Sequence, residues 1–183
     1  MAADHISDAT PIERAAPQRA NAAFMRRHPS RWIALGFGSG LSPWAPGTVG
    51  TLWAWVAFLV FGQWLDAAAW GAVIGASLVV GVWACTRTAQ DLVAADPGAI
   101  VWDEIVAFWI VLWLVMPAGA VMQLIAFALF RFFDAVKPGP VGWIDQRFKR
   151  ARGWRQGVGI MADDLVAALC TLLVIAAWRT VVA

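Results

Sequence analysis

The sequence is poor in charge. Only 14% of its 183 residues are Asp, Glu, Lys or Arg, compared with about a quarter in ordinary soluble proteins. Apolar residues make up 61% of the chain, and the mean hydropathy is +0.66. The net charge is only +2 and no basic stripe interleaved with aromatics occurs, which excludes a nucleic-acid-binding protein. The composition indicates a single integral-membrane domain.

Tyrosine is absent, and cysteine is nearly so. Cys85 and Cys170 stand alone in apolar stretches, without the paired spacing of a zinc site or a redox motif, so we expect both to be small buried residues. Tryptophan, in contrast, occurs thirteen times. Indole rings favour the boundary between water and lipid, which agrees with a membrane protein.

The first thirty residues lack the apolar core of a signal peptide. They are rich in alanine, proline and charge. We therefore expect residues 1–30 to be a mobile cytoplasmic tail and residues 31–183 to be the membrane-embedded domain.

Four apolar runs follow, at residues 52–65, 67–85, 105–133 and 165–182. A membrane-spanning helix needs about 20 mainly apolar residues, so the second and fourth runs fit and the first is short. The third run is interrupted by Pro117 and Gly119, residues that disfavour a continuous helix. It is either one helix about 40 Å long or a helical hairpin.

The distribution of basic residues favours the hairpin. Lysine and arginine are absent from the connection near residue 66 and from the turn near residue 117. With a hairpin, every basic loop falls on one side of the membrane, as the positive-inside rule requires for a cytoplasmic N-terminus, and Arg179 is the single exception. The sequence thus predicts an all-α, multihelical integral-membrane bundle with about five apolar helical segments, the two hairpin arms being short for full spans.

Carboxylates gather at the ends of these segments. Asp103 and Glu104 begin one hairpin arm, Asp134 ends the other, and Asp163 and Asp164 are expected to begin the last helix. In the hairpin topology all of them lie at one membrane face. Buried unpaired carboxylates cost several kcal/mol, so such a cluster is favourable if a cation neutralises it. Oxygen ligands suit Mg²⁺, although acidic residues at a helix start can also cap it, an alternative that does not apply to Asp134.

Two basic residues accompany Asp134 on one helical face. Arg131, Asp134 and Lys137 recur every three residues, before Pro138 ends the helix. A guanidinium and an ammonium beside a metal-binding carboxylate suit the binding of a phosphoryl group. The alternative is that the two cations only satisfy carbonyls at the helix C-terminus.

Two glycine-containing segments complete the polar regions. Residues 36–51 expose backbone N–H groups and hydroxyls just before an apolar helix, so they either cradle a phosphate or form a flexible loop. They match neither a Walker A motif nor a dinucleotide fingerprint. Residues 157–164 are expected to form a loop with two glycines that leads into the last acidic pair.

The sequence lacks the residues that several known phosphatase mechanisms require. The only histidines, His5 and His28, lie in the N-terminal region, so a phosphohistidine at a membrane core has no candidate, and the DxDx[TV] motif of haloacid-dehalogenase phosphatases is missing. The remaining hypothesis is attack by a metal-activated water, with a carboxylate accepting its proton.

The chain resembles the phosphatidylglycerophosphatase A family in four blocks. These are GFGSGLSPWAPGTVGTL (residues 36–52), IVWDEIVAFW (100–109), FRFFDAVKPGPVGWID (130–145) and GVGIMADDLVA (157–167). The resemblance implies Mg²⁺-dependent hydrolysis of phosphatidylglycerophosphate to phosphatidylglycerol and inorganic phosphate, at the cytoplasmic face of a bacterial inner membrane.

The resemblance also implies which residues form the site. The expected metal ligands are Asp103, Glu104, Asp134, Asp163 and Asp164, of which Asp103, Asp134 and Asp164 are the expected catalytic residues; the family's acidic positions also include Asp145. The family's glycine-serine segment gives Gly38, Ser39, Gly40, Ser42, Gly47 and Thr48 as expected substrate-binding residues, to which the spacing around Asp134 adds Arg131 and Lys137.

Three other functions compete with this interpretation. Another lipid phosphate could be the substrate. A small cation transporter or channel would place its carboxylates near the bilayer midplane, whereas here they lie at the ends of apolar runs. A CDP-alcohol phosphatidyltransferase would carry a DGxxAR motif, which this sequence lacks.

Overall fold

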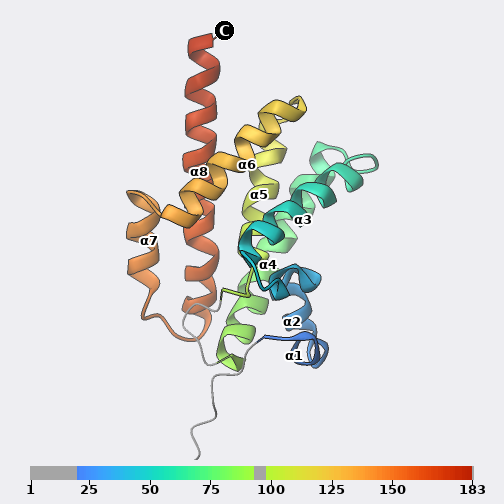
Figure 1. Ribbon diagram of the computed structural model, residues 1–183, viewed down its shortest axis with the longest axis vertical. Helices are drawn as coiled ribbons and strands as arrows, with labels where there is room; N and C mark the ends of the chain where they lie inside the picture. The colour runs from blue at the N-terminus through green and yellow to red at the C-terminus, as the bar shows by residue number, and fades with distance from the viewer. Residues whose placement is uncertain (1–19, 93–97, 183) are drawn as a thin grey trace, which may run out of the picture.

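The computed structural model describes residues 20–92 and 98–182 (Figure 1). Its elements are α1 (Ala22–Arg26), α2 (Pro29–Ala34), the short 3-10 helix η1 (Gly36–Leu41), α3 (Pro46–Phe61), α4 (Ala67–Asp91), α5 (Trp102–Val115), α6 (Ala120–Val136), α7 (Pro140–Phe148) and α8 (Trp154–Val182). Within these ranges the chain forms helices and no strand, which confirms the all-α prediction.

Local sequence signals set several helix ends. The Asp66 side chain accepts a hydrogen bond of 2.8 Å from the Ala69 N–H and so caps α4. Pro46 and Pro140 occupy the first turns of α3 and α7, where a missing N–H costs nothing. At the end of α6, Lys137 adopts the left-handed conformation (φ 49°) and terminates the helix.

The predicted hairpin is confirmed. Helix α5 ends at Val115 and α6 begins at Ala120, and Arg131 of α6 lies 3.1 Å from Glu104 of α5. Figure 1 shows the α5–α6 turn and the α3–α4 connection on the same side of the molecule as the C-terminus, while α1, α2 and the beginning of α8 lie on the other. The helices therefore alternate in direction as the charge pattern predicted.

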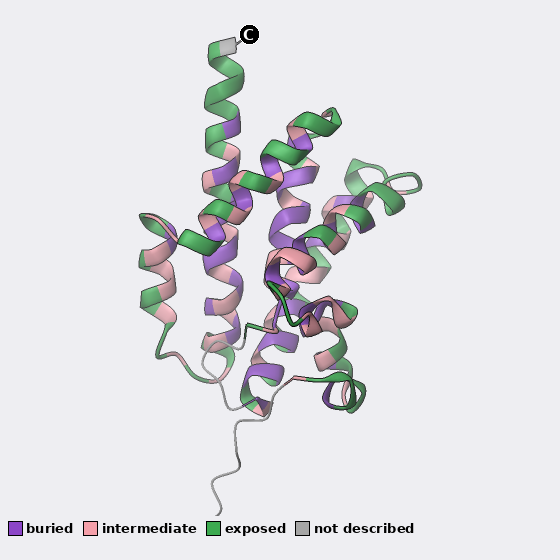
Figure 2. Ribbon diagram, viewed as in Figure 1, coloured by how far each residue is buried: buried purple, intermediate pink, exposed green. Residues whose placement is uncertain are grey.

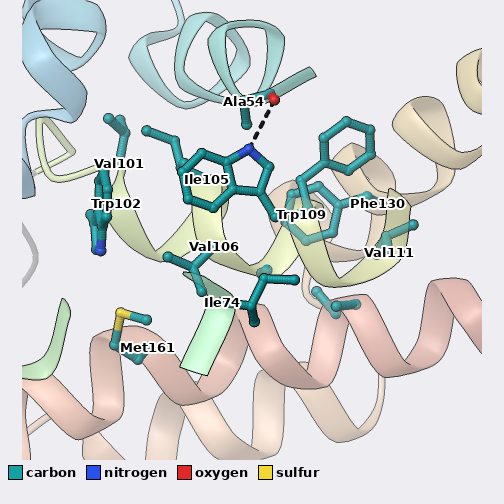
Figure 3. Packing of buried hydrophobic residues seen from close by; sticks show 14 of the residues in the cluster. Ala54, Ile74, Val101, Trp102, Ile105, Val106, Trp109, Val111, Phe130 and Met161 are labelled. Carbon is teal, nitrogen blue, oxygen red and sulfur yellow. Dashed lines mark hydrogen bonds between the residues drawn. The ribbon is translucent and has the colours of Figure 1, made fainter. Parts of the chain in front are cut away.

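Helix α5 is the centre of the hydrophobic core. Nine of its fourteen residues are buried, and they face all sides of the helix (Figure 2). Its Trp109 indole N–H donates a 2.9 Å hydrogen bond to the Ala54 carbonyl of α3, shown in Figure 3. A helix that is apolar all round is covered on all sides, and here α3, α4, α6 and α8 all contact it.

The prediction of about five membrane segments is supported only in part. Among the described residues, two helices are long and apolar enough to cross a bilayer, α4 over Ala67–Asp91 and α8 over Trp154–Val181. In the most apolar stretch of each helix, only 28% (α4) and 44% (α8) of the residues are buried, so most positions are free to contact lipid. The other three apolar segments form α3, α5 and α6, with 16, 14 and 17 residues.

The expected start of the last helix was wrong. Helix α8 begins at Trp154, so Asp163 and Asp164 lie inside it and residues 157–164 are helical instead of a loop. The reason is close packing. A Cβ on Gly157 would lie only 2.5 Å from the Val82 carbonyl of α4, so this glycine allows two helices to approach each other.

The predicted tail lies mostly outside the described residues, which begin at residue 20. The division at residue 30 stays a prediction. The described part of that segment contains α1, whose Phe24 and Met25 are buried beside Leu35 and Leu92.

Candidate active site

A cavity of about 400 Å³ opens between α5, α6, α7 and α8. All seven charged residues predicted for the metal and the phosphate line it: Asp103, Glu104, Arg131, Asp134, Lys137, Asp163 and Asp164. The hairpin places α5 and α6 side by side, and the long α8 adds the last two aspartates from within its length. Charged residues that are far apart in the sequence, from Asp103 to Asp164, thus line the same cavity.

Three of these carboxylates are grouped closely enough to hold one metal ion. Glu104, Asp134 and Asp164 each offer an oxygen, and these oxygens all lie within 4.8 Å of one another. Each comes from a different helix, α5, α6 or α8. Three carboxylate oxygens with space for water are a donor set that fits Mg²⁺.

Two carboxylate oxygens at the cavity have no hydrogen-bond partner among the described residues. These are Oδ1 of Asp103 and Oδ2 of Asp164, and both atoms are buried. Asp164 as a whole is only 3% exposed. A buried carboxylate oxygen without a partner is costly, so a cation at this position would stabilise the site.

Arg131 lies directly beside the three-carboxylate group. Its guanidinium is 3.1 Å from Oε1 of Glu104 and also forms an ion pair with Asp134. The side chain is 19% exposed at the cavity. It partly neutralises the cluster and is in reach of an anionic group that enters the cavity.

Lys137 joins three helices at the rim of the cavity. Its ammonium donates to Asp145 of α7 at 2.8 Å and to Asp163 of α8. Burial by itself lowers the pKa of Lys137, but the hydrogen bonds and negative charges of Asp145 and Asp163 outweigh burial and raise that pKa well above its ordinary value. Lys137 therefore stays charged, and Asp163 faces an ammonium as well as the cavity.

Gly47, at the start of α3, packs against this centre. A Cβ at that position would overlap the carboxylate of Glu104, so only glycine lets α3 approach α5 so closely. Of the glycine-serine segment, Gly47 is the residue that reaches the acidic cluster.

None of the predicted substrate-binding residues of that segment lines the cavity itself; besides Gly47, they are Gly38, Ser39, Gly40, Ser42 and Thr48. The Ser39 hydroxyl donates to the Gly36 carbonyl and that of Ser42 donates to the Trp44 carbonyl, both at 2.8 Å. Their role in substrate binding stays a prediction.

Sequence reasoning gave no role to several residues that line the cavity. Phe148, Lys149 and Gln156 belong to α7, its C-terminal edge and the start of α8. Their position depends on how α7 folds back along α8, which no local motif indicates. Asp145 was implied by the family resemblance alone, and the structure shows it paired with Lys137.

Comparisons with known proteins identify the family of the chain. The family model for phosphatidylglycerophosphatase A matches residues 32–179. A phosphatidylglycerophosphatase A of Escherichia coli is 38% identical over 143 residues, which are 78% of each chain. One of Haemophilus influenzae is 36% identical over 148 residues, 81% of this chain and 87% of the relative.

A third relative carries a different name. This Bacteroides thetaiotaomicron protein, named as a candidate phosphatidylinositol-3-phosphatase, is 37% identical over 158 residues, 82% of this chain and 93% of its own. No solved structure matches. From the family model and the extent of these similarities, the chain belongs to the phosphatidylglycerophosphatase A family.

Proposed function

We propose that this enzyme hydrolyses phosphatidylglycerophosphate to phosphatidylglycerol and inorganic phosphate, with Mg²⁺ held by Glu104, Asp134 and Asp164. The observation that carries the proposal is the group of three carboxylate oxygens within 4.8 Å, in a cavity that Arg131 and Lys137 also line. The names of two relatives support the choice of substrate.

The residues of the cavity divide the chemical tasks. Arg131, beside the cluster, binds the phosphate and orients it for in-line attack. Asp103, with a buried oxygen that has no partner, accepts a proton from the attacking water. Bound Mg²⁺ would supply charge neutralisation and a lowered pKa of a coordinated water. In the net reaction, the water oxygen bonds to phosphorus, the ester bond to the glycerol oxygen breaks, and that oxygen takes a proton.

We place the enzyme in the bacterial inner membrane, with several helices in the bilayer and the cavity at the cytoplasmic face. The apolar helices α4 and α8 support membrane insertion. The basic residues of the α6–α8 connection support a cytoplasmic position for that end of the bundle.

A second candidate substrate class is another lipid phosphate. The observation in its favour is the relative named for phosphatidylinositol 3-phosphate, which is as similar to this chain as the other two. A cation transporter with the same carboxylates would release no phosphate at all.

The test is phosphate release by the purified full chain in detergent–lipid micelles. Phosphatidylglycerophosphate, phosphatidic acid and phosphatidylinositol 3-phosphate are compared at equal surface fractions, with Mg²⁺ or with EDTA. We expect Mg²⁺-dependent release, fastest from phosphatidylglycerophosphate. Faster release from another lipid would overturn the substrate, release in EDTA would overturn the metal, and no release from any lipid would overturn the enzyme activity.

A further inference from the structure

Helix α7 has an inner face that fixes it to the bundle. Val141 is fully buried, and Asp145 forms the ion pair with Lys137. Phe148 packs so closely on Gly159 of α8 that a Cβ there would overlap its side chain. These positions recur at helical spacing, so α7 is held in one orientation about its axis.

The outer face of α7 has a different character. Trp143 is 65% exposed, and Gln146 and Arg147, three and four residues further on, are exposed on the same side of the helix. Among the described residues, the Trp143 indole stacks on no other ring and the Arg147 guanidinium forms no ion pair. This face combines an apolar ring with a positive charge, as do helices that lie along a membrane surface.

Positive charge continues beyond α7 without any compensation. Arg147, Lys149, Arg150, Arg152 and Arg155 are all exposed, and none forms an ion pair with a described residue. Residues 146–162 contain no Asp or Glu. Trp154, at the beginning of α8, is 68% exposed among these cations. An unpaired cluster of this density attracts a surface of opposite charge.

This region borders the mouth of the candidate active site. Phe148, Lys149 and Gln156 line the cavity, while their neighbours Arg147, Arg150 and Arg155 point to solvent. Whatever binds the outer residues is therefore held next to the cavity.

We infer that this surface, formed by Trp143, Arg147, Arg150, Arg152, Trp154 and Arg155, docks on the anionic head groups of a phospholipid bilayer. Clusters of four or more arginines and lysines beside an apolar helix bind acidic lipids, and tryptophans lie at the head-group level. Here the apolar helix is α8, which begins within the cluster. Docking enriches acidic lipids at the cavity mouth, where the proposed substrate is itself anionic.

The test measures lipid enrichment directly and does not depend on turnover. A fluorophore is attached to a cysteine introduced by Gln146→Cys in the full chain. Cys170, which is partly exposed, is replaced by alanine, and Cys85 stays because it is fully buried and does not react. The protein is placed in nanodiscs of phosphatidylcholine with about 20% phosphatidylserine, a level chosen so that acidic lipid is present but limiting. Energy transfer is compared between discs with head-group-labelled phosphatidylserine and discs with labelled phosphatidylcholine.

We expect transfer to phosphatidylserine to exceed transfer to phosphatidylcholine by about two- to threefold, and the excess to disappear in 0.5 M salt because surface charges are then screened over ~4 Å. Arg150→Gln/Arg152→Gln should abolish most of the excess. The matched control, Arg26→Gln/Arg27→Gln, removes the same charge from exposed positions outside this surface and should retain it.

Equal transfer to both lipids in the unmodified protein would overturn the inference. So would an equal loss in the two double variants, since net charge alone would then explain the enrichment. Because neither result involves phosphate release, the lipid phosphatase proposal would stand or fall separately.

Discussion

Within the described residues, two cavities of nearly equal size, about 400 Å³ and about 410 Å³, can be compared. The first is lined by carboxylates and cations from α5, α6, α7 and α8. The second lies between the α3–α4 and α5–α6 connections and is lined mainly by Phe58, Leu59, Leu65, Trp70, Trp113, Met116 and Pro117. The two cavities thus have similar volumes, but only the first is lined by charged side chains.

It is the converging ionisable groups, and not the empty space, that make the first cavity the candidate active site. The apolar cavity also holds an unpaired polar atom, the buried Nε1 of Trp70, but it has no charged side chain in its lining. It can gain little from an ion, whereas the acidic cavity has several negative charges to neutralise. Disturbing the two cavities should therefore have unequal consequences.

The largest effect is expected from the three-carboxylate group. Asp134→Asn and Asp164→Asn should each reduce phosphate release by about a thousandfold, because a neutral amide binds Mg²⁺ weakly. Circular dichroism should show unchanged helix content. The matched control is Asp66→Asn, an exposed carboxylate near the apolar cavity that an asparagine can replace as a helix cap. Full activity in both active-site variants would exclude this metal centre.

A somewhat smaller loss is expected from Gly47→Ala. The added methyl group would displace the Glu104 carboxylate, and a shift of about 1 Å near reacting groups can cost about a hundredfold in rate. Gly75→Ala is the control, because a Cβ on this exposed glycine of α4 meets no atom within 4 Å. Equal kcat values for the two variants would show that Gly47 does not position Glu104.

The cations should affect substrate binding more than metal binding. Arg131→Ala and Lys137→Ala should raise KM for the lipid phosphate by about tenfold or more, since each removes a charge-assisted contact. The Mg²⁺ concentration for half-maximal activity should change less. If both quantities changed equally, a structural role would be favoured, and for Lys137 this role would be its link between Asp145 and Asp163.

The smallest effect is expected in the apolar cavity. Trp113→Phe removes the 3.0 Å hydrogen bond from the indole N–H to the Ala67 carbonyl. The free energy of unfolding should fall by about 1 kcal/mol, as measured by denaturant titration in detergent, and kcat should not change. A large loss of activity would show that the two cavities communicate.

Much of this arrangement could be predicted from the sequence. Pro117 and the uncharged turn around it, together with the basic loops, were enough to predict that Asp103 and Asp134 return to the same side. All seven charged site residues indeed line one cavity. Charge distribution is informative because the membrane restricts how helices can be threaded.

The predictions that were wrong concerned features that depend on contacts between helices far apart in the sequence. Gly157 and Gly159 suggested a loop, but they allow α8 to pack on α4 and α7, and the helix simply continues. Apolar composition also could not distinguish α5, which is covered by protein, from α8, whose most apolar stretch is only 44% buried. The contact of Lys137 with Asp163 follows from how α6 meets α8, which no local pattern encodes.

We propose that carboxylates from α5, α6 and α8 meet at one divalent ion. Binding of Mn²⁺ to the purified full chain, followed by electron paramagnetic resonance, tests it most directly and needs no substrate. Saturable binding that Mg²⁺ competes away, lost in Asp164→Asn and kept in Asp66→Asn, is the predicted result. Equal Mn²⁺ binding by these two variants would show that Asp164 does not hold the ion.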